Sequence, residues 1–505
     1  MRTTLGAVVL GVVLMEEARS QVSIGREEDP RAAVLRQRRE TYPHLTQIVD
    51  LVHSVPAELA ADALVRVAGD PRNHDVAWKT ELLELSFETA ALAREPNRRQ
   101  IIATRAVAKS RAEIISLGFD QRLDRLSLQC RAVREMLPLD NAKALDMFQR
   151  IVFPRLRRLT CQDALIDNVE EYYLLAGQIV ESAFTADQRE HGQHVDLLSD
   201  QVSRMNAPVE VGAVAKVLSS SRLREGELNL LASRFAANLE QIESDDRSFS
   251  ASFKRNDEEL QQLVSALVAK NISSEGLIAA YRRYLSRNLR GNRCIDSGGN
   301  EFTTWVRDSF NQKFASDNDA RRAPLTADDL KPVKTEGQAD WEPFVSDDEF
   351  ERAFQQYLDL WLGKGHGPLM GKGSRPLLDE QKSSTEWQTE FDDFLRQIDD
   401  IKPKTSEPEH RYFYRKATAL QGALRVAPPG PERDKVIRQF VAFLRSSNLR
   451  QESFLEWYGQ AQRTMSAIRN LGPEASARLI DELERSGDSV LSFYALASRV
   501  IPERR

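Results

Sequence analysis

Four arginines that are close together in the sequence form the densest group of side chains that could bind a ligand. Arg283, Arg287 and Arg290 are spaced at i, i+4 and i+7, so on a helix they would share one face, and Arg293 follows soon after. Guanidinium groups bind phosphate, sulfate and carboxylate through paired hydrogen bonds. The cluster therefore predicts an anion-binding site. The commoner interpretation of such a run is a solvated helix end, where the helix dipole favours positive charge.

The three cysteines, Cys130, Cys161 and Cys294, allow one disulfide. Cys130 lies on an apolar helical stripe, which indicates a core position. Cys161 lies at the predicted start of another helix, where Thr160 and Asp163 match a capping box and the helix dipole would lower a thiol pKa. No histidine is near Cys161 in the sequence, and Cys161 falls on the stripe of its own helix. We therefore favour a buried thiol or a disulfide with Cys130 over a catalytic cysteine.

His191 and His194 are three residues apart and on a helix could share a metal ion with Asp187 or Asp196. Protein zinc sites use three or four ligands in a defined geometry, and Gly192 between the two histidines weakens a helix. We therefore predict no metal site here and two exposed histidines.

No local motif of a catalytic or cofactor-binding type is found. Residues 367–373 (GPLMGKG) resemble a phosphate-binding loop, but three residues instead of four separate the glycines, and glycine follows Lys372. Neither a Gly-x-Ser-x-Gly turn nor a Gly-x-Gly-x-x-Gly turn opening a helix is present. The sequence thus predicts no catalytic residues from local patterns and no cofactor.

Apolar residues recur with helical spacing along most of the chain, and the alternation typical of strands is rare. Each stripe must be buried against another helix, and short turns separate the stripes. We therefore predict an all-α fold of stacked amphipathic helices, resembling an α-solenoid or helical-repeat array. The stripes include Leu126, Cys130, Val133 and Leu137; Leu165, Val169, Tyr172, Ala176 and Ile179; Leu228, Leu231, Phe235, Leu239 and Ile242; and Leu260, Leu263 and Leu267.

The regular pattern lapses over residues 315–345, which are rich in Asp, Lys, Pro and Gly and are predicted to form a linker. The linker would join a helical-repeat-like domain over 21–314 to a smaller C-terminal helical domain over 346–505. Two aromatic stripes, at 350–361 and 387–398, are interpreted as core rather than as a recognition groove. Residues 331–410 are acidic and 411–505 basic, which favours packing of these segments on each other or an exposed dipole that orients a partner.

Residues 1–20 have the pattern of a cleavable secretory signal. Arg2 precedes an apolar run over 5–15, and the small residues Ala18 and Ser20 come directly before Gln21. The run is about eleven residues long, whereas a membrane-spanning helix needs about twenty. We therefore predict cleavage between Ser20 and Gln21, a periplasmic or secreted protein, and no transmembrane segment in the mature chain.

The net charge of −6 makes a nucleic-acid partner unexpected. Export, stacked helices and the lack of catalytic motifs favour a scaffold or binding protein for a protein or anionic polymer partner. One alternative is a secreted enzyme that acts on carbohydrate or another polymer through carboxylates dispersed along the chain. The other is a cytosolic helical scaffold whose N-terminus only resembles a signal.

Overall fold

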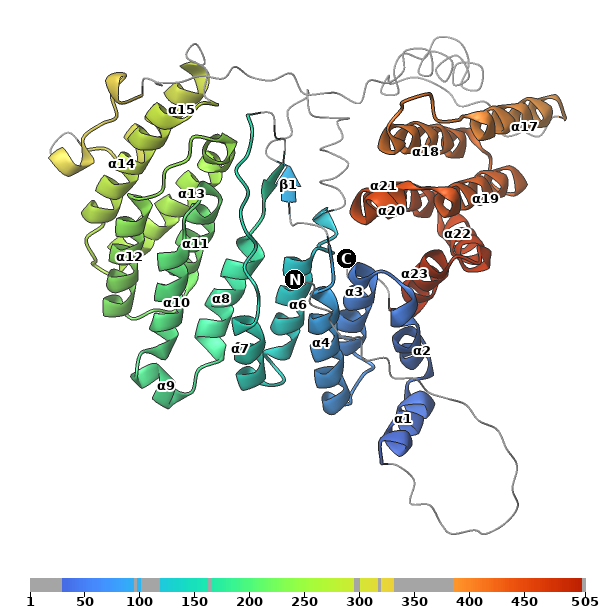
Figure 1. The fold of residues 1–505 in the computed structure, drawn as a ribbon, viewed down its shortest axis with the longest axis horizontal. Helices are drawn as coiled ribbons and strands as arrows, with labels where there is room; N and C mark the ends of the chain where they lie inside the picture. The colour runs from blue at the N-terminus through green and yellow to red at the C-terminus, as the bar shows by residue number, and fades with distance from the viewer. Residues whose placement is uncertain are drawn as a thin grey trace, which may run out of the picture. The chain divides into compact units, whose positions relative to one another are not determined.

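The computed structural model describes residues 30–94, 98–100, 119–161, 163, 165–294, 300–316, 319–330 and 385–501. The regular secondary structure of these residues is helical apart from one two-stranded sheet, which confirms the predicted all-α class (Figure 1). The predicted signal segment and cleavage site at Ser20 and Gln21 lie outside the described residues, as do the aromatic stripe at 350–361 and the glycine-rich loop at 367–373.

The chain divides into two compact units, Met1–Thr46 and Gln47–Arg505. The described part of the first unit contains α1 (Pro30–Thr41) and the beginning of α2 (Pro43–Leu51). Pro43 occupies the first position of α2, where its missing N–H is not needed for a helical hydrogen bond.

Stacked helices form the first part of the second unit, after the short 3-10 helix η1 (Val52–Ser54). Each helix packs on a neighbour in sequence or on the helix two further along, as α8 does on α6 and α10, and α12 on α10 and α14. Figure 1 shows them side by side in chain order, the arrangement that the stripes predict. The helices are α3 (Ala57–Ala68), α4 (Val76–Ala90), α6 (Arg125–Met136), α7 (Asn141–Gln149), α8 (Glu170–Ser182), α9 (Ala186–Glu190), α10 (Gln193–Arg204), α11 (Pro208–Ser220), α12 (Glu225–Leu239), α13 (Arg247–Ala269), α14 (Glu275–Gly291) and α15 (Asn300–Lys313).

Local sequence explains where many of these helices begin and which face they bury. The carboxylates of Asp75, Asp124 and Asp140 each accept a hydrogen bond from a backbone N–H in the first turn of α4, α6 and α7. The predicted α12 stripe is buried at every position from Leu228 to Leu239, against the neighbouring helices α10 and α14. The apolar periodicity therefore identifies the packed faces correctly.

One predicted helix start is wrong. The carboxylate of Asp163 accepts hydrogen bonds from the backbone N–H and hydroxyl of Thr160, but this turn does not open a helix. Instead β2 (Leu165–Asp167) pairs antiparallel with β1 (Arg98–Gln100), with Gln100 opposite Leu165. Helix α8 begins only at Glu170. The pairing strand is far away in sequence, so local periodicity could not reveal it.

Part of the predicted linker packs against α14. The short 3-10 helices η2 (Ala320–Arg322) and η3 (Asp328–Leu330) both contact α14. Arg282 of α14 donates to the backbone oxygen of Ala323 at 2.8 Å and forms an ion pair with Asp329 at 2.9 Å. Residues 331–345 lie outside the described residues.

The C-terminal helices form a further stack in which α17 packs on α18 and α19, α18 on α21, and α22 on α19, α21 and α23. Trp387, Phe391 and Phe394 of α17 are buried, which confirms the core interpretation of that aromatic stripe. Lys435 of α19 lies 2.9 Å from Asp392 of α17, so acidic and basic segments do pack together here. The helices are α17 (Thr385–Asp400), α18 (Glu409–Val426), α19 (Pro431–Ser446), α20 (Leu449–Glu452), α21 (Phe454–Arg469), α22 (Pro473–Arg485) and α23 (Ser489–Val500).

Within the described residues, no helix is both long and apolar enough to cross a membrane.

Candidate anion-binding site

The predicted arginine face of α14 is largely occupied by contacts with α12. Arg283 forms an ion pair with the carboxylate of Glu240, and Arg287 donates to the backbone oxygen of the same residue. Glu240 ends α12, so these guanidinium groups lie at the negative end of its dipole. Arg290 is exposed. Arg283 and Arg287 thus contact the end of α12, whereas the alternative interpretation has the arginines at the solvated C-terminus of their own helix.

Arg293 holds two loops together. Its backbone N–H donates to the oxygen of Asp245 at 3.1 Å, and its guanidinium donates to the oxygen of Leu159 at 3.2 Å. These two loops follow α12 and α7, respectively. These contacts of Arg293 are with residues other than Glu240, where Arg283 and Arg287 meet.

The predicted disulfide between Cys130 and Cys161 is wrong, because Cys161 is bonded to Cys294. Cys130 lies inside α6 and is completely buried, and burial raises the pKa of its thiol well above the usual range. Cys161 lies in the irregular segment before β2, beside the Leu159 backbone that Arg293 holds. The neighbouring Cys294 is thereby brought to it from 133 residues further along the chain.

The two histidines differ in environment, so the expectation that both are exposed is wrong for one of them. His191 is exposed, whereas His194 is only 4% exposed and its Nε2 lies 3.2 Å from a carboxylate oxygen of Glu227. His194 lies on the face of α10 that packs against α12. Among the described residues, no group of three His, Cys, Asp or Glu side chains is arranged to hold a metal ion.

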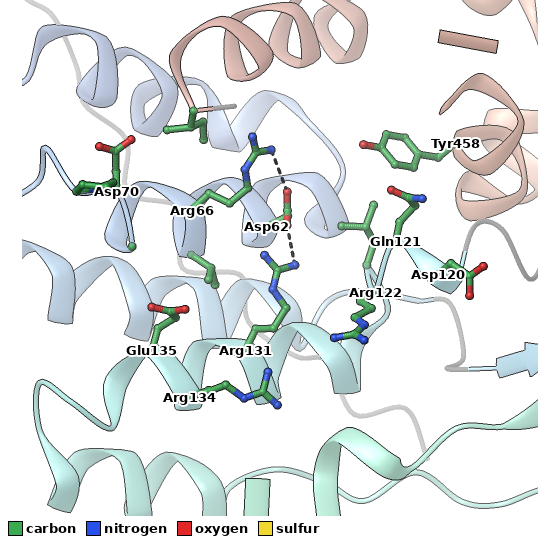
Figure 2. Close-up of a pocket in the computed structure, with 15 residues that line it drawn as sticks. Asp62, Arg66, Asp70, Asp120, Gln121, Arg122, Arg131, Arg134, Glu135 and Tyr458 are labelled. Carbon is green, nitrogen blue, oxygen red and sulfur yellow. Dashed lines mark hydrogen bonds and ion pairs between the residues drawn. The ribbon is translucent and has the colours of Figure 1, made fainter. Parts of the chain in front are cut away.

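A larger site, which the sequence did not indicate, is a cavity of about 700 Å³ with walls formed mainly by α3 and α6 and the turn before α6 (Figure 2). This volume is within the range of small-molecule sites in proteins. Four arginines line the cavity: Arg66, Arg122, Arg131 and Arg134. Carboxylates line the cavity as well. The ion pairs that they form with the arginines decide how much positive charge is available to a ligand.

The carboxylate of Asp62 is shared by two arginines. Nη1 of Arg131 lies 2.7 Å from Oδ1 of Asp62, and Nη1 of Arg66 lies 3.5 Å from Oδ2 (Figure 2). The other terminal nitrogen of Arg66, Nη2, is buried and has no hydrogen-bond partner within the described part of the chain. Buried donors in native proteins are nearly always paired. This nitrogen has almost no accessible surface, so a ligand in the cavity could reach it only after a shift of the side chain.

A second carboxylate, that of Glu171 in α8, is also shared by two arginines. Arg134 and Arg122 each place a terminal nitrogen 2.8 Å from one of its oxygens. The Nε of Arg134 also donates to Gln178 at 3.2 Å. In these two ion-pair groups, four guanidinium groups therefore share two carboxylates, so four positive charges face two negative ones.

The turn that carries Arg122 has an uncommon backbone conformation. Arg122 has φ 54°, in the left-handed region that favours glycine, and its N–H donates to the oxygen of Phe119 at 2.8 Å. A non-glycine residue there costs about 1 kcal/mol, and such residues are frequent at functional sites. The same turn directs Asp120 into the cavity lining. Partial burial raises the pKa of Asp120, while the charge of Arg122 opposes this rise.

Asp70, another charged residue of the cavity lining, is paired with an arginine that lies outside the lining. Asp70 accepts two hydrogen bonds from Arg72, at 2.9 and 2.7 Å, and Arg72 also donates to the backbone oxygen of Val500. This bidentate pairing orients the carboxylate of Asp70. Glu135 of α6 and Tyr458 of α21 complete the polar lining.

Sequence patterns show parts of this site but not their convergence. Asp62 and Arg66 are four residues apart, and Arg131 and Arg134 three apart, which on separate helices indicates only ordinary surface pairs. Only the packing of α3 on α6 and of α6 on α8 brings the four arginines together. Comparison of the chain with protein-family models, curated proteins and solved structures finds no match.

Proposed function

We propose that this chain is an exported, helical-repeat-like binding protein whose cavity between α3 and α6 takes an anionic ligand. The observation that carries the proposal is the sharing of two carboxylates, Asp62 and Glu171, by four arginines. Phosphate, sulfate and carboxylate groups all match the planar donors of a guanidinium group.

Binding explains the site better than catalysis by these residues. Arginine stays protonated at all ordinary pH values and is a poor proton-transfer group. Asp62 and Glu171 are each held in place by ion pairs with two of these arginines. The central residues therefore provide charge and hydrogen-bond donors, which is what ligand recognition requires.

Export is supported by the sequence and by one feature of the fold. The signal-like segment at 1–20 would direct the chain out of the cytosol, and the Cys161–Cys294 disulfide is of a kind that persists in oxidising compartments. Sequencing the N-terminus of the mature protein tests this part of the proposal. A start at Gln21 supports export, whereas retained Met1 supports the cytosolic alternative.

A second candidate function is hydrolysis of a carbohydrate or another polymer in the same cavity. The presence of Asp120 in the cavity lining favours it, because the general acid in such enzymes is a carboxyl group with a raised pKa, and the pKa of Asp120 is raised. The cavity also contains Asp70 and Glu135 as further carboxylates. Release of reducing sugar from a polysaccharide panel, lost in Asp120→Asn, would support this function.

Calorimetric titration of the purified protein with inorganic phosphate tests anion binding. We expect the wild-type protein to bind, and Arg66→Gln and Arg131→Gln to weaken binding at least tenfold, because each removes a central donor. Arg290→Gln is the matched control, since Arg290 is an exposed arginine on α14. Far-UV circular dichroism of each variant checks that it is folded.

Two results would contradict the proposed site. If phosphate does not bind, the shared carboxylates do not create an anion site. If Arg290→Gln weakens binding as strongly as Arg66→Gln, the site lies at the predicted cluster of Arg283, Arg287, Arg290 and Arg293 instead.

A further inference from the structure

We propose that a second, smaller cavity binds a single-ring aromatic carboxylate. The walls of this aromatic cavity are formed mainly by α8, α10 and residues 153–156, and its volume is about 190 Å³. An apolar protein cavity of about 150 Å³ holds benzene, so the aromatic cavity has room for one ring and a small substituent. It shares no lining residue with the cavity between α3 and α6, so the two sites can be tested separately.

Aromatic and apolar side chains form the floor and one wall of the aromatic cavity. Tyr172 and Tyr173 of α8, which form the floor, are only 4% and 3% exposed, and their rings meet edge to face with centroids 5.5 Å apart. The half-buried ring of Phe153 meets both of them edge to face, with centroid distances of 5.0 and 5.9 Å. Leu156 is also half-buried and lines the same cavity. Because aromatic rings favour edge-to-face and offset contacts, a ligand ring would extend this cluster.

The buried polar groups of the aromatic cavity favour a ligand that brings hydrogen-bond acceptors. The side-chain oxygen of Gln201 accepts a hydrogen bond from the hydroxyl of Tyr172 at 2.9 Å, which leaves the N–H donors of the Gln201 amide for another partner. Both carboxylate oxygens of Glu210 are already occupied. One accepts from Tyr173 at 2.6 Å, and the other from the two backbone N–H groups directly before α11, at 2.8 and 2.9 Å.

Two exposed arginines in the lining, Arg155 and Arg204, supply positive charge at the rim. Arg155 has no ion pair or hydrogen bond within the described part of the chain. Arg204 is paired with Asp200 at 2.7 Å, and such exposed pairs along one helix are weak. Burial raises the pKa of the Tyr172 hydroxyl to about 12, and the positive charge of Arg204 opposes this rise. The guanidinium group of Arg204 therefore acts on the floor of the cavity.

These contacts together select a ring that carries a negative charge. A carboxylate would be the partner that Arg155 lacks, and guanidinium groups bind carboxylates through paired hydrogen bonds. A ring with an ammonium group would instead meet two guanidinium groups of the same sign. A small anion without a ring would leave the aromatic wall in contact with water.

Benzoate, benzyl alcohol and acetate separate the two requirements. Benzoate has both the ring and the carboxylate, benzyl alcohol has the ring without the charge, and acetate has the charge without the ring. We expect the wild-type protein to bind benzoate at least tenfold more tightly than either of the others, because only benzoate can meet both the aromatic wall and Arg155. Titrations followed by ligand-observed nuclear magnetic resonance measure these affinities, including weak ones.

Substitution of Arg155 tests the recognition of the carboxylate. Arg155→Gln should weaken benzoate binding at least fivefold and should leave benzyl alcohol binding within about twofold, because it removes the charge but not the ring contacts. Arg155 is exposed, so its substitution should leave the fold intact. Arg290→Gln is the matched control, since Arg290 is an exposed arginine on α14 and lines neither cavity.

Filling the aromatic cavity tests the position of the ring. Leu156→Trp places an indole group against the space that the ligand ring needs, so it should weaken binding of both benzoate and benzyl alcohol at least tenfold. Circular dichroism checks that this variant is folded. If it does not fold, the comparison of wild-type protein with Arg155→Gln still decides the matter.

The contrary outcomes separate this site from the proposed function. If benzoate binds no more tightly than acetate or benzyl alcohol, or equally to Arg155→Gln and wild-type protein, the aromatic carboxylate site is overturned. It is also overturned if Arg66→Gln weakens benzoate binding as strongly as Arg155→Gln, since benzoate then occupies the cavity between α3 and α6. If benzoate behaves as expected and phosphate does not bind, the aromatic carboxylate site stands and the proposed anion site fails.

Discussion

The carboxylate of Asp62 lies 2.7 Å from Nη1 of Arg131, and this ion pair joins α3 to α6 in the wall of the cavity. Arg66, one turn after Asp62 on α3, approaches the same carboxylate from the other side. One negative charge therefore stabilises two positive charges from two helices. The stability of this helix pair and the affinity of the cavity for anions should both depend on Asp62.

Asp62→Asn should lower the free energy of unfolding by about 2 kcal/mol, because it leaves two partly buried guanidinium groups without a charged partner. The variant should also be stabilised more by added inorganic phosphate than the wild-type protein, since the freed arginines bind the anion. Urea unfolding with and without phosphate measures both effects. Equal stabilisation of the two proteins by phosphate would place the anion elsewhere.

Glu210 should make stability depend on pH. It is buried at the start of α11 and accepts hydrogen bonds from Tyr173 at 2.6 Å and from the backbone N–H groups of Asn206 and Ala207. Burial raises the pKa of Glu210, although these hydrogen bonds oppose the rise. The folded protein therefore holds this proton more tightly than the unfolded chain. The resulting stability is full below the unfolded pKa of about 4.3 and is lost as pH rises through the raised folded value.

The matched pair Glu210→Gln and Glu210→Ala tests this prediction. Glutamine can keep the three contacts without an ionisable group, so it should cost less than about 1 kcal/mol at neutral pH and abolish this pH dependence. Alanine leaves Tyr173 and two backbone N–H groups unpaired and should cost about 3 kcal/mol. Unfolding free energies measured from roughly pH 4 to 8 check both values. An unchanged pH profile in Glu210→Gln would show that another group titrates.

The number of reactive thiols in the native and unfolded protein should test the disulfide pairing. The native oxidised protein should show no reactive thiol, because Cys130 is buried and its pKa is raised, and Cys161 is bonded to Cys294. Unfolding without reductant should expose one thiol, and unfolding after reduction three. Reduction should also cost about 4 kcal/mol of stability, since the bond closes a long loop. A peptide map that links Cys130 to Cys161 would contradict the pairing.

The α14 arginines should differ in their effects on stability. Replacing Arg283 and Arg287 together by alanine should cost about 1 kcal/mol, because both contact Glu240 at the end of α12. Arg290→Ala should leave the melting temperature nearly unchanged, since Arg290 is exposed. Thermal unfolding of the two variants makes the comparison. Equal effects would show that the contacts with Glu240 add nothing.

The sequence by itself determined the helical class and many local details. The stripe from Leu228 to Leu239 is buried as predicted, and the carboxylate of Asp140 caps α7 at the turn after Pro138. Both results follow from interactions within a few residues. An amphipathic period of 3.6 requires a buried face whatever the partner helix, and a capping carboxylate needs only the next turn of the chain.

Only the tertiary structure decided the disulfide, the β pairing and the cavity. Cys161 could not be matched to Cys294, nor Leu165 to Gln100, without knowing which distant segments meet. The meeting of Arg122 and Arg134 at Glu171 likewise depends on the packing of α6 on α8. A sequence pattern specifies which face of a helix is apolar, but the partner and register of that face come from packing across the whole chain. The charges that meet at a cavity are a consequence of that packing.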